Sequence, residues 1–190
     1  MAVSTQPNSV AQPQAIPLSI YVHIPWCVKK CPYCDFNSHE ANSALPEREY
    51  ILALCDDIES ELEAINKSEF SKSRPITSVF FGGGTPSLMS GDFYSQVMAL
   101  LRENFQFEED VEVTIEANPG AIDEGFFKDY VAAGINRLSL GVQGFSDHSL
   151  QLLGRIHHKS DIYRAFDTAR DAGFYNINID LMHGLPDQTL

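Results

Sequence analysis

Residues 20–36 read IYVHIPWCVKKCPYCDF and hold three of the four cysteines of the chain. Cys27, Cys31 and Cys34 follow the pattern Cys-x3-Cys-x2-Cys, directly after a run in which apolar residues alternate with polar ones. Thiolates are soft ligands that suit zinc, copper(I) and iron–sulfur clusters. Three of them on one short loop can hold three irons of a [4Fe–4S] cubane and leave the fourth iron open to another ligand. The stretch therefore predicts an iron–sulfur site.

Two other interpretations of the cysteines remain open. A structural zinc ion could take the three thiolates together with His23 or His39. Zinc sites more often use two separated pairs of ligands, and the sequence has no second pair. A disulfide with one spare thiol is the other alternative, and it belongs to oxidising compartments.

The composition is that of a globular protein with one substantial domain. The 26 acidic residues outnumber the 13 basic ones, and the net charge of −13 argues against binding to nucleic acid or to an anionic membrane. No apolar run approaches the ~18 residues of a membrane span. The start of the chain lacks the basic and apolar regions of a secretory signal, so we expect a cytoplasmic protein. Residues 1–17 are expected to be disordered, and residues 18–190 to form the domain.

Periodicity predicts an alternation of strands and helices along the domain. Cys55 lies on the apolar stripe of the first helix, so we interpret it as a core residue. A surface loop is expected at 66–75. The expected strands are 19–24, 76–81, 111–117, 136–142 and 176–182, and the expected helical segments are 46–65, 91–104, 123–133, 146–153 and 160–172.

Five such strand–helix alternations with short connections predict an α/β fold with a parallel sheet. A doubly wound sheet and a barrel both fit this order of elements. In the strand at 111–117, Val113 and Ile115 face one side while Glu112 and Glu116 face the other. A sheet covered by helices on both faces should be apolar on both, so the pattern favours a curved sheet whose polar face lines a cavity.

Distinctive residues lie at or near the carboxyl end of every strand, where ligands bind in such folds. They are the cysteine loop, Gly82–Gly84, Glu116, Gln143 and Asp180. The glycines allow a close approach of the backbone to a ligand, although a tight turn would also use them. Asp180 interrupts an apolar strand and needs a partner. Arg155 is a candidate for this partner or for a substrate clamp.

The stretch YVHIPWCVKKCPYCDF at 21–36 resembles the signature of the radical S-adenosylmethionine (SAM) superfamily, within its coproporphyrinogen-oxidase-like family. It is most similar to the HemW branch, the haem chaperones, because the decarboxylating branch has a further cysteine where this chain has Phe36. The resemblance covers residues 18–190. It implies a partial (β/α)6 barrel with about five β/α units present, in an N-terminal fragment that lacks the C-terminal part of the barrel.

The resemblance also implies the cofactors, which are a [4Fe–4S] cluster on Cys27, Cys31 and Cys34, and SAM. Reduction of the sulfonium of SAM would give methionine and a 5′-deoxyadenosyl radical. Positions that resemble contacts to the cluster-bound SAM are Tyr21, Gly83 and Glu116. Positions that resemble contacts to a second SAM are Tyr33, Gly84, Thr85, Gln143, Arg155 and Asp180.

Three further residues invite a functional interpretation. We interpret the pair His157-His158 as a polar connection between helices rather than a haem or metal site. His183 ends the last strand and is a candidate contact to haem or substrate. Trp26 is expected to pack over the cysteine loop and to limit the access of water to it.

Two function classes follow from the resemblance, and a third from the ligands alone. The first is a haem chaperone, which binds haem and transfers it to an acceptor protein. The second is an oxygen-independent coproporphyrinogen III oxidase, whose substrate is a porphyrinogen. Either would need an electron donor as a partner. The third is a zinc-stabilised binding module.

Overall fold

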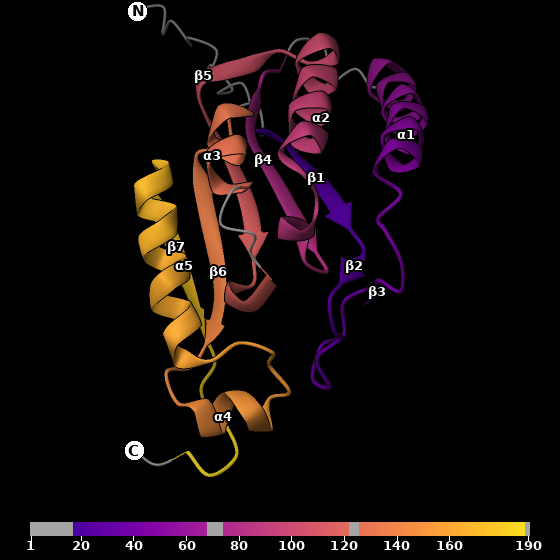
Figure 1. Cartoon of the computed structure of the whole chain (residues 1–190). Helices are drawn as coiled ribbons and strands as arrows, with labels where there is room; N and C mark the ends of the chain where they lie inside the picture. Colours follow the sequence, from indigo (N-terminus) through magenta and orange to yellow (C-terminus); the bar gives the residue numbers. More distant parts are fainter. Residues whose placement is uncertain (1–16, 68–73, 122–125, 189–190) are drawn as a thin grey trace, which may run out of the picture.

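The main sheet is parallel, and its five strands follow one another in chain order (Figure 1). The computed structural model describes residues 17–67, 74–121 and 126–188. Because all four pairings in this sheet are parallel, the carboxyl ends of the strands lie at the same edge of the sheet. This arrangement confirms the predicted α/β fold. The strands are β1 (Leu18–Ile24), β4 (Ile76–Gly83), β5 (Phe107–Ala117), β6 (Arg137–Gln143) and β7 (Asn176–Leu181).

The helices at 47–67, 91–104, 126–132 and 159–172 lie along one face of the sheet, whereas the short helix at 147–152 lies beyond the carboxyl ends of the strands (Figure 1). Neighbouring helices contact each other in the order α1, α2, α3, α5. In the part of the chain that the structure describes, no helix covers the opposite face, which agrees with the polar strand faces noted in the sequence. Among the described residues, no helix is both long and apolar enough to cross a membrane. The helices are α1 (Glu47–Lys67), α2 (Gly91–Asn104), α3 (Phe126–Ala132), α4 (Asp147–Leu152) and α5 (Lys159–Ala172).

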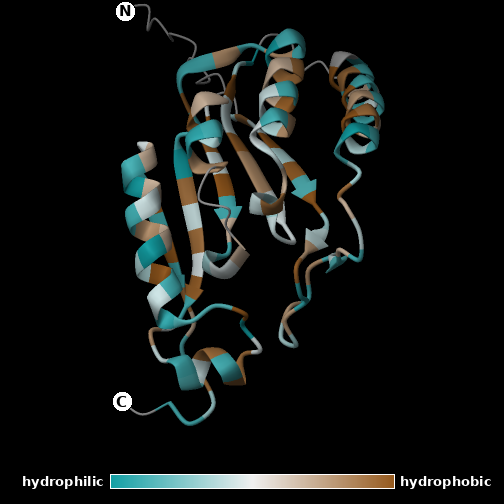
Figure 2. Ribbon diagram, in the orientation of Figure 1, coloured by the Kyte–Doolittle hydropathy of each residue, from teal (hydrophilic) through white to brown (hydrophobic). Residues whose placement is uncertain are grey.

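The core lies between the sheet and these helices, and the strands supply it with every second residue. Figure 2 shows apolar and polar residues alternating along the strands. Complete burial of one such aliphatic or aromatic side chain stabilises the fold by about 1.5–3 kcal/mol. The buried strand residues include Val22, Ile24, Val79, Phe81, Val113, Ile115, Leu138 and Leu140.

Buried tyrosines fix the turn that follows the glycine run of β4. The Tyr94 hydroxyl donates a hydrogen bond to the Pro86 carbonyl oxygen at 2.7 Å. The Tyr130 hydroxyl contacts the carbonyl oxygens of Ser87 and Met89 at 3.1 and 2.9 Å. A buried hydroxyl without a partner would cost about 1–3 kcal/mol, so these bonds tie the turn firmly to the core.

The structure corrects several predicted boundaries. Strand β5 begins at Phe107, four residues before the predicted start. Helix α1 continues to Lys67, so the loop expected at 66–75 begins later than predicted. Two strands of two residues each, β2 (Trp26–Cys27) and β3 (His39–Glu40), were not predicted. The expectations for residues 1–16, for most of the loop at 66–75 and for the start of the third helix lie outside the described residues.

The interpretation of Cys55 as a core residue was wrong. Its thiol is free and only half-buried, and the residue is not part of the buried core. The apolar stripe of α1 borders a solvent-accessible groove of about 470 Å³ beside β1. This stripe is therefore less completely covered than its helical spacing suggested.

Candidate cluster and cofactor site

A cavity of about 440 Å³ lies at the carboxyl ends of the strands, within the usual size range for small-molecule sites. The cysteine loop, residues 27–36, forms one wall, and the ends of β4, β5, β6 and β7 form the rest. The cavity brings together all three cysteines of the predicted cluster site and eight of the nine predicted SAM contacts. Those eight are Tyr33, Gly83, Gly84, Thr85, Glu116, Gln143, Arg155 and Asp180.

The cysteine loop is held in shape by hydrogen bonds within the protein. The pairing of β2 with β3 closes the base of the loop. The Lys30 ammonium group donates to the carbonyl oxygens of Phe36 and Ser38, each at 3.1 Å. The backbone amide of Lys30 donates to the Glu40 carboxylate at 3.0 Å. Lysine at this position therefore stabilises the loop conformation that presents the thiols.

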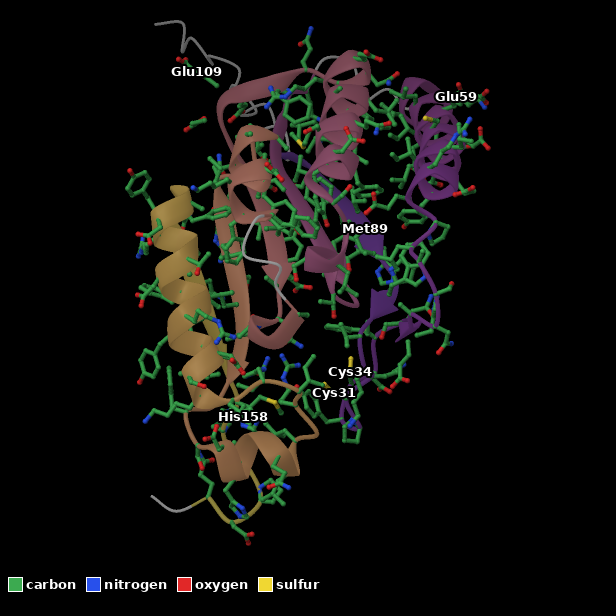
Figure 3. The ribbon with its side chains drawn as sticks, in the orientation of Figure 1. Cys31, Cys34, Glu59, Met89, Glu109 and His158 are labelled. Atoms are coloured by element: carbon green, nitrogen blue, oxygen red, sulfur yellow. The ribbon has the colours of Figure 1, made fainter. Side chains whose placement is uncertain are left out.

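The three thiols provide the donor set of a cluster with one open iron. Cys27 is buried, while Cys31 and Cys34 are half-buried, and all three are free. Figure 3 shows Cys31 and Cys34 on the cysteine loop, below the ends of the strands. Among the described residues, no three His, Cys, Asp or Glu side chains converge on a point where one metal ion could bind. A cubane does not require such convergence, because each thiolate binds a different iron.

The histidines proposed as zinc ligands are arranged for other contacts. One ring nitrogen of His23 is 3.1 Å from the Tyr21 hydroxyl, and the other is 2.8 Å from the Asn37 carbonyl oxygen. His39 is exposed, and its ring meets the Trp26 ring edge-on. The zinc interpretation with His23 as fourth ligand thus gains no support from the geometry.

Two glycines at the end of β4 pack against residues 23–27, where the chain passes from β1 into the cysteine loop. A Cβ atom added at Gly84 would lie 2.5 Å from the Trp26 carbonyl oxygen and 3.0 Å from the Cys27 sulfur. A Cβ atom at Gly83 would lie 2.7 Å from the His23 ring, and its φ of 118° is in the region that favours glycine. Glycine is required here for the close approach of β4 to the thiol-bearing segment.

Glu116 stands on the cavity floor beside these glycines. Its carboxylate accepts a hydrogen bond from the Gly83 amide at 3.2 Å. Burial raises the pKa of Glu116 above its ordinary value and nearby Asp180 raises it further, while the Gly83 amide and His23 oppose the rise. A cationic ligand would favour the ionised form of this carboxyl. The sulfonium and ammonium groups of SAM have the matching charge.

Asp180 has a different partner from the one predicted. Its carboxylate accepts from the Ser139 hydroxyl at 3.1 Å and from the Asn178 side-chain amide at 2.7 Å. The Asn178 amide also contacts the Ser139 hydroxyl at 3.1 Å. The prediction that Arg155 pairs with Asp180 is therefore wrong, and neutral side chains orient this carboxylate.

Arg155 instead joins β6 to the cysteine loop. Its Nη2 donates to the Gly141 carbonyl oxygen at 2.8 Å. Its Nη1 lies 3.4 Å from the Cys31 sulfur and 3.5 Å from the Tyr33 hydroxyl. Its Nε is buried and has no hydrogen-bond partner in the structure. The arginine thus belongs to the cavity, but it faces the cysteines.

Three residues lie away from the places expected for them. Tyr21 does not line the cavity, and its side chain is 57% exposed beside His23. His183 is exposed and does not line the cavity either. Trp26 packs edge-on against the rings of His39 and Tyr50, at 6.0 and 5.0 Å between centroids, so it supports the base of the loop.

Several residues of the cavity wall were not predicted from the sequence. Asn118 follows β5 directly, and its position at a strand end could have indicated it. Ser139 alternates with the apolar residues of β6 on the cavity side, which was a weaker signal. The missed lining residues include Lys29, Lys30, Phe36, Asn118, Ser139 and Met182.

His157 was also misjudged, because it is buried rather than part of a polar connection. Its ring nitrogens lie 3.1 Å from the Asn118 side-chain oxygen and 3.1 Å from the Val142 carbonyl oxygen. Burial lowers the pKa of His157 to about 4, and the positive charge of Arg155 contributes to the shift. His157 therefore packs the segment after α4 against the ends of β5 and β6.

Residues 21–190 match the family model of the Radical SAM superfamily, so the chain belongs to this superfamily. Membership implies a [4Fe–4S] cluster and SAM as cofactors. The glycines that pack against the cysteine loop, the three free thiols and the buried unpaired Nε of Arg155 are consistent with these groups.

The chain is 47% identical to the Heme chaperone HemW of Haemophilus influenzae over 178 residues, which cover 94% of this chain and 46% of the relative. It is 45% identical to the Heme chaperone HemW of Escherichia coli over 174 residues, covering 92% of this chain and 44% of the relative. The chain therefore spans less than half the length of these curated relatives. Among solved structures, it resembles the coproporphyrinogen III oxidase HemN of Escherichia coli, with a TM-score of 0.79 and 38% identity over 91% of this chain and 38% of that one. This likeness confirms the predicted α/β fold of the partial-barrel type.

Proposed function

We propose that the full-length protein carrying this chain is a haem chaperone, which binds haem and transfers it to acceptor proteins. The observation that carries the proposal is the 45–47% identity to proteins named Heme chaperone HemW over more than nine-tenths of the chain. Phe36 supports it, because the decarboxylating branch has a cysteine at that position. The partners would be haem, an acceptor protein and an electron donor, and the compartment would be the cytoplasm.

In this proposal, Cys27, Cys31 and Cys34 ligate the [4Fe–4S] cluster. The eight cavity residues predicted from the resemblance bind SAM, and Tyr21, which lies outside the cavity, stays a prediction. Glu116 would meet a positively charged part of SAM, because it is the half-buried carboxylate beside the glycines. When bound, the cluster and SAM supply reductive cleavage of the sulfonium, and the protein binds them and excludes solvent.

A second candidate is an oxygen-independent coproporphyrinogen III oxidase. It is favoured by the TM-score of 0.79 to the Escherichia coli enzyme of that name. The residues that resemble contacts to a second SAM also line the cavity. Common descent of the two branches explains the presence of these second-SAM residues equally well, so they are weak support for the oxidase. The identity of 45–47% to the chaperones exceeds the 38% to the oxidase and favours the chaperone.

One experiment separates the two functions. The full-length protein is reconstituted anaerobically with iron and sulfide and mixed with SAM, a low-potential reductant and coproporphyrinogen III. We expect no protoporphyrinogen, and protoporphyrinogen formation above that of the cluster-free Cys31→Ala variant would overturn the chaperone proposal.

A second measurement tests the chaperone function directly. Haem is titrated into the reconstituted protein, and the loaded protein is mixed with a haem-free acceptor whose absorption changes when it takes up haem. We expect saturable binding and transfer that is faster than from free haem. Binding without transfer, or no binding, would contradict the proposal.

A further inference from the structure

The contact between Arg155 and the cysteine loop joins two parts of the chain that are far apart in sequence. The Nη1 of Arg155 lies 3.4 Å from the Cys31 sulfur across 124 residues. The preceding residue also meets the loop, because a Cβ atom added at Gly154 would lie 2.8 Å from a ring carbon of Pro32. Gly154 has a φ of 69°, so this approach uses a backbone conformation that favours glycine. The segment after α4 is therefore shaped to lie against the cysteine loop.

The guanidinium group of Arg155 is fixed in its orientation. Its Nη2 is bound to the Gly141 carbonyl oxygen at 2.8 Å, at the end of β6. A guanidinium is planar, so anchoring one nitrogen restricts where the others point. The free direction of Nη1 is toward Cys31 and the Tyr33 hydroxyl. The arginine is half-buried, and its buried Nε has no hydrogen-bond partner, so a negative charge beside the guanidinium would be favourable.

We propose that Arg155 donates a charge-assisted hydrogen bond to the Cys31 thiolate when that thiolate ligates the cluster, and that this bond raises the reduction potential of the cluster. A thiolate bound to a cluster keeps negative charge on sulfur, which attracts the half-buried guanidinium group. Hydrogen bonds to the sulfurs are among the factors that set the potential of such clusters. A nearby positive charge stabilises the reduced cluster more than the oxidised one, because the reduced cluster is one charge more negative. The inference rests on the proposed cluster.

This role differs from a contact to SAM, because it operates before any SAM is bound. Arg155 would act as a positioning residue that holds a positive charge against one particular ligand sulfur. Cys27 occupies a different environment, since its sulfur lies against the glycine end of β4. The three ligands would therefore be electronically unequal, with Cys31 as the sulfur stabilised by a cation.

The test measures the midpoint potential of the reconstituted full-length protein without SAM, by a redox titration followed through the electron paramagnetic resonance of the reduced cluster. Arg155→Met removes both the hydrogen-bond donors and the positive charge. Arg155→Lys keeps the positive charge but lacks the planar guanidinium group with its two donor nitrogens Nη1 and Nη2. Arg102→Met is the matched control. Arg102 is exposed and stacks on the Phe107 ring, so this variant removes one positive charge away from the cavity.

We expect Arg155→Met to reduce the ratio of reduced to oxidised cluster at fixed potential by about tenfold, which is a shift of about 59 mV to more negative values for one electron. Arg155→Lys should give a smaller shift in the same direction, and Arg102→Met should match the wild type. If Arg155→Met does not hold iron, Arg155→Lys carries the same test.

A wild-type potential in both Arg155 variants, or an equal shift in Arg102→Met, would overturn the inference. Failure of both Arg155 variants to hold iron, with a normal Arg102→Met protein, would also overturn it, because Arg155 would then serve cluster assembly rather than its potential. A wild-type protein without iron and acid-labile sulfide would instead overturn the cluster proposal itself.

Discussion

Gly84→Ala is expected to damage both the stability of the domain and its cluster site. The added Cβ would lie 2.5 Å from the Trp26 carbonyl oxygen and 2.9 Å from the Trp26 carbonyl carbon. Both are backbone atoms, so no side chain can rotate away to make room. The same carbonyl oxygen accepts the Thr85 amide at 2.7 Å, and the Gly84 amide donates to the Ile24 carbonyl oxygen at 2.7 Å.

The magnitude follows from these contacts. A carbon atom normally stays about 3.3 Å or more from a carbonyl oxygen, so the two backbones must separate by roughly 0.8 Å. Overpacking of this kind costs about 1–3 kcal/mol. Weakening the bond between the Thr85 amide and the Trp26 carbonyl adds about 0.5–1.5 kcal/mol. We expect a loss of about 2–4 kcal/mol, which lowers the melting temperature of a domain of this size by about 4–16 °C.

The assay is thermal unfolding of the cluster-free protein followed by circular dichroism, together with the iron content after reconstitution. Iron should fall as well, because the Cβ would also lie 3.0 Å from the Cys27 sulfur. Gly144→Ala is the control, since its added Cβ would meet only a Leu185 methyl group at 3.9 Å. A Gly84→Ala protein that melts within about 1 °C of the wild type and holds the same iron would refute this reasoning.

Three further predictions concern the cavity and the segment after α4. Cys31→Ala should abolish iron and sulfide incorporation without changing the far-ultraviolet circular dichroism, because the loop lies outside the core; iron at the wild-type level would contradict this. Glu116→Gln should weaken SAM binding, measured by calorimetry, with the cluster preserved. Burial raises the pKa of Glu116 above its ordinary value of 4.5. The protonated carboxyl therefore stabilises the fold below pH 4.5, and this stabilisation is lost as the pH rises through the pKa of the folded state. Glu116→Gln should accordingly melt at a higher temperature than the wild type at pH 7 but not at pH 4. The pKa of His157 is lowered from 6.5 to about 4, so its contribution is present above pH 6.5 and is lost as the pH falls toward 4. Between roughly pH 7.5 and 5, the unfolding free energy of the wild type should fall by about 2 kcal/mol more than that of His157→Gln in urea titrations, and equal slopes would contradict the assignment.

The strands were predictable where apolar and polar residues alternate, and their ends were less so. The first part of strand β5 carries three charged residues, Glu108 to Asp110, and all three are exposed. Charge alone made this segment resemble a loop. The pair β2 and β3 has only two residues in each strand, which is too short for any period to be visible.

The residues that line the cavity were largely predictable, because parallel strands bring their carboxyl ends to one edge of the sheet. The side-chain partners were not, because they depend on register. Ser139 pairs with Asn178 across β6 and β7, so Asp180 lies diagonally from Ser139 on the same face and meets its hydroxyl. The sequence does not contain that register, and opposite charge alone suggested Arg155. The burial of His157 likewise depends on how the segment after α4 packs against Val142 and Asn118.

The strand order has a consequence for synthesis of the protein on the ribosome. Because each strand pairs with the one made just before it, the sheet can grow one β/α unit at a time as the chain emerges. The cysteines belong to the first unit, whereas Arg155 follows Cys31 by 124 residues. At about 5–20 residues per second, the thiols are made roughly 6–25 s before the arginine that faces them. The contact between Arg155 and Cys31 can therefore form only after β6 has been made, and the cysteine loop of the nascent chain lacks this contact until then.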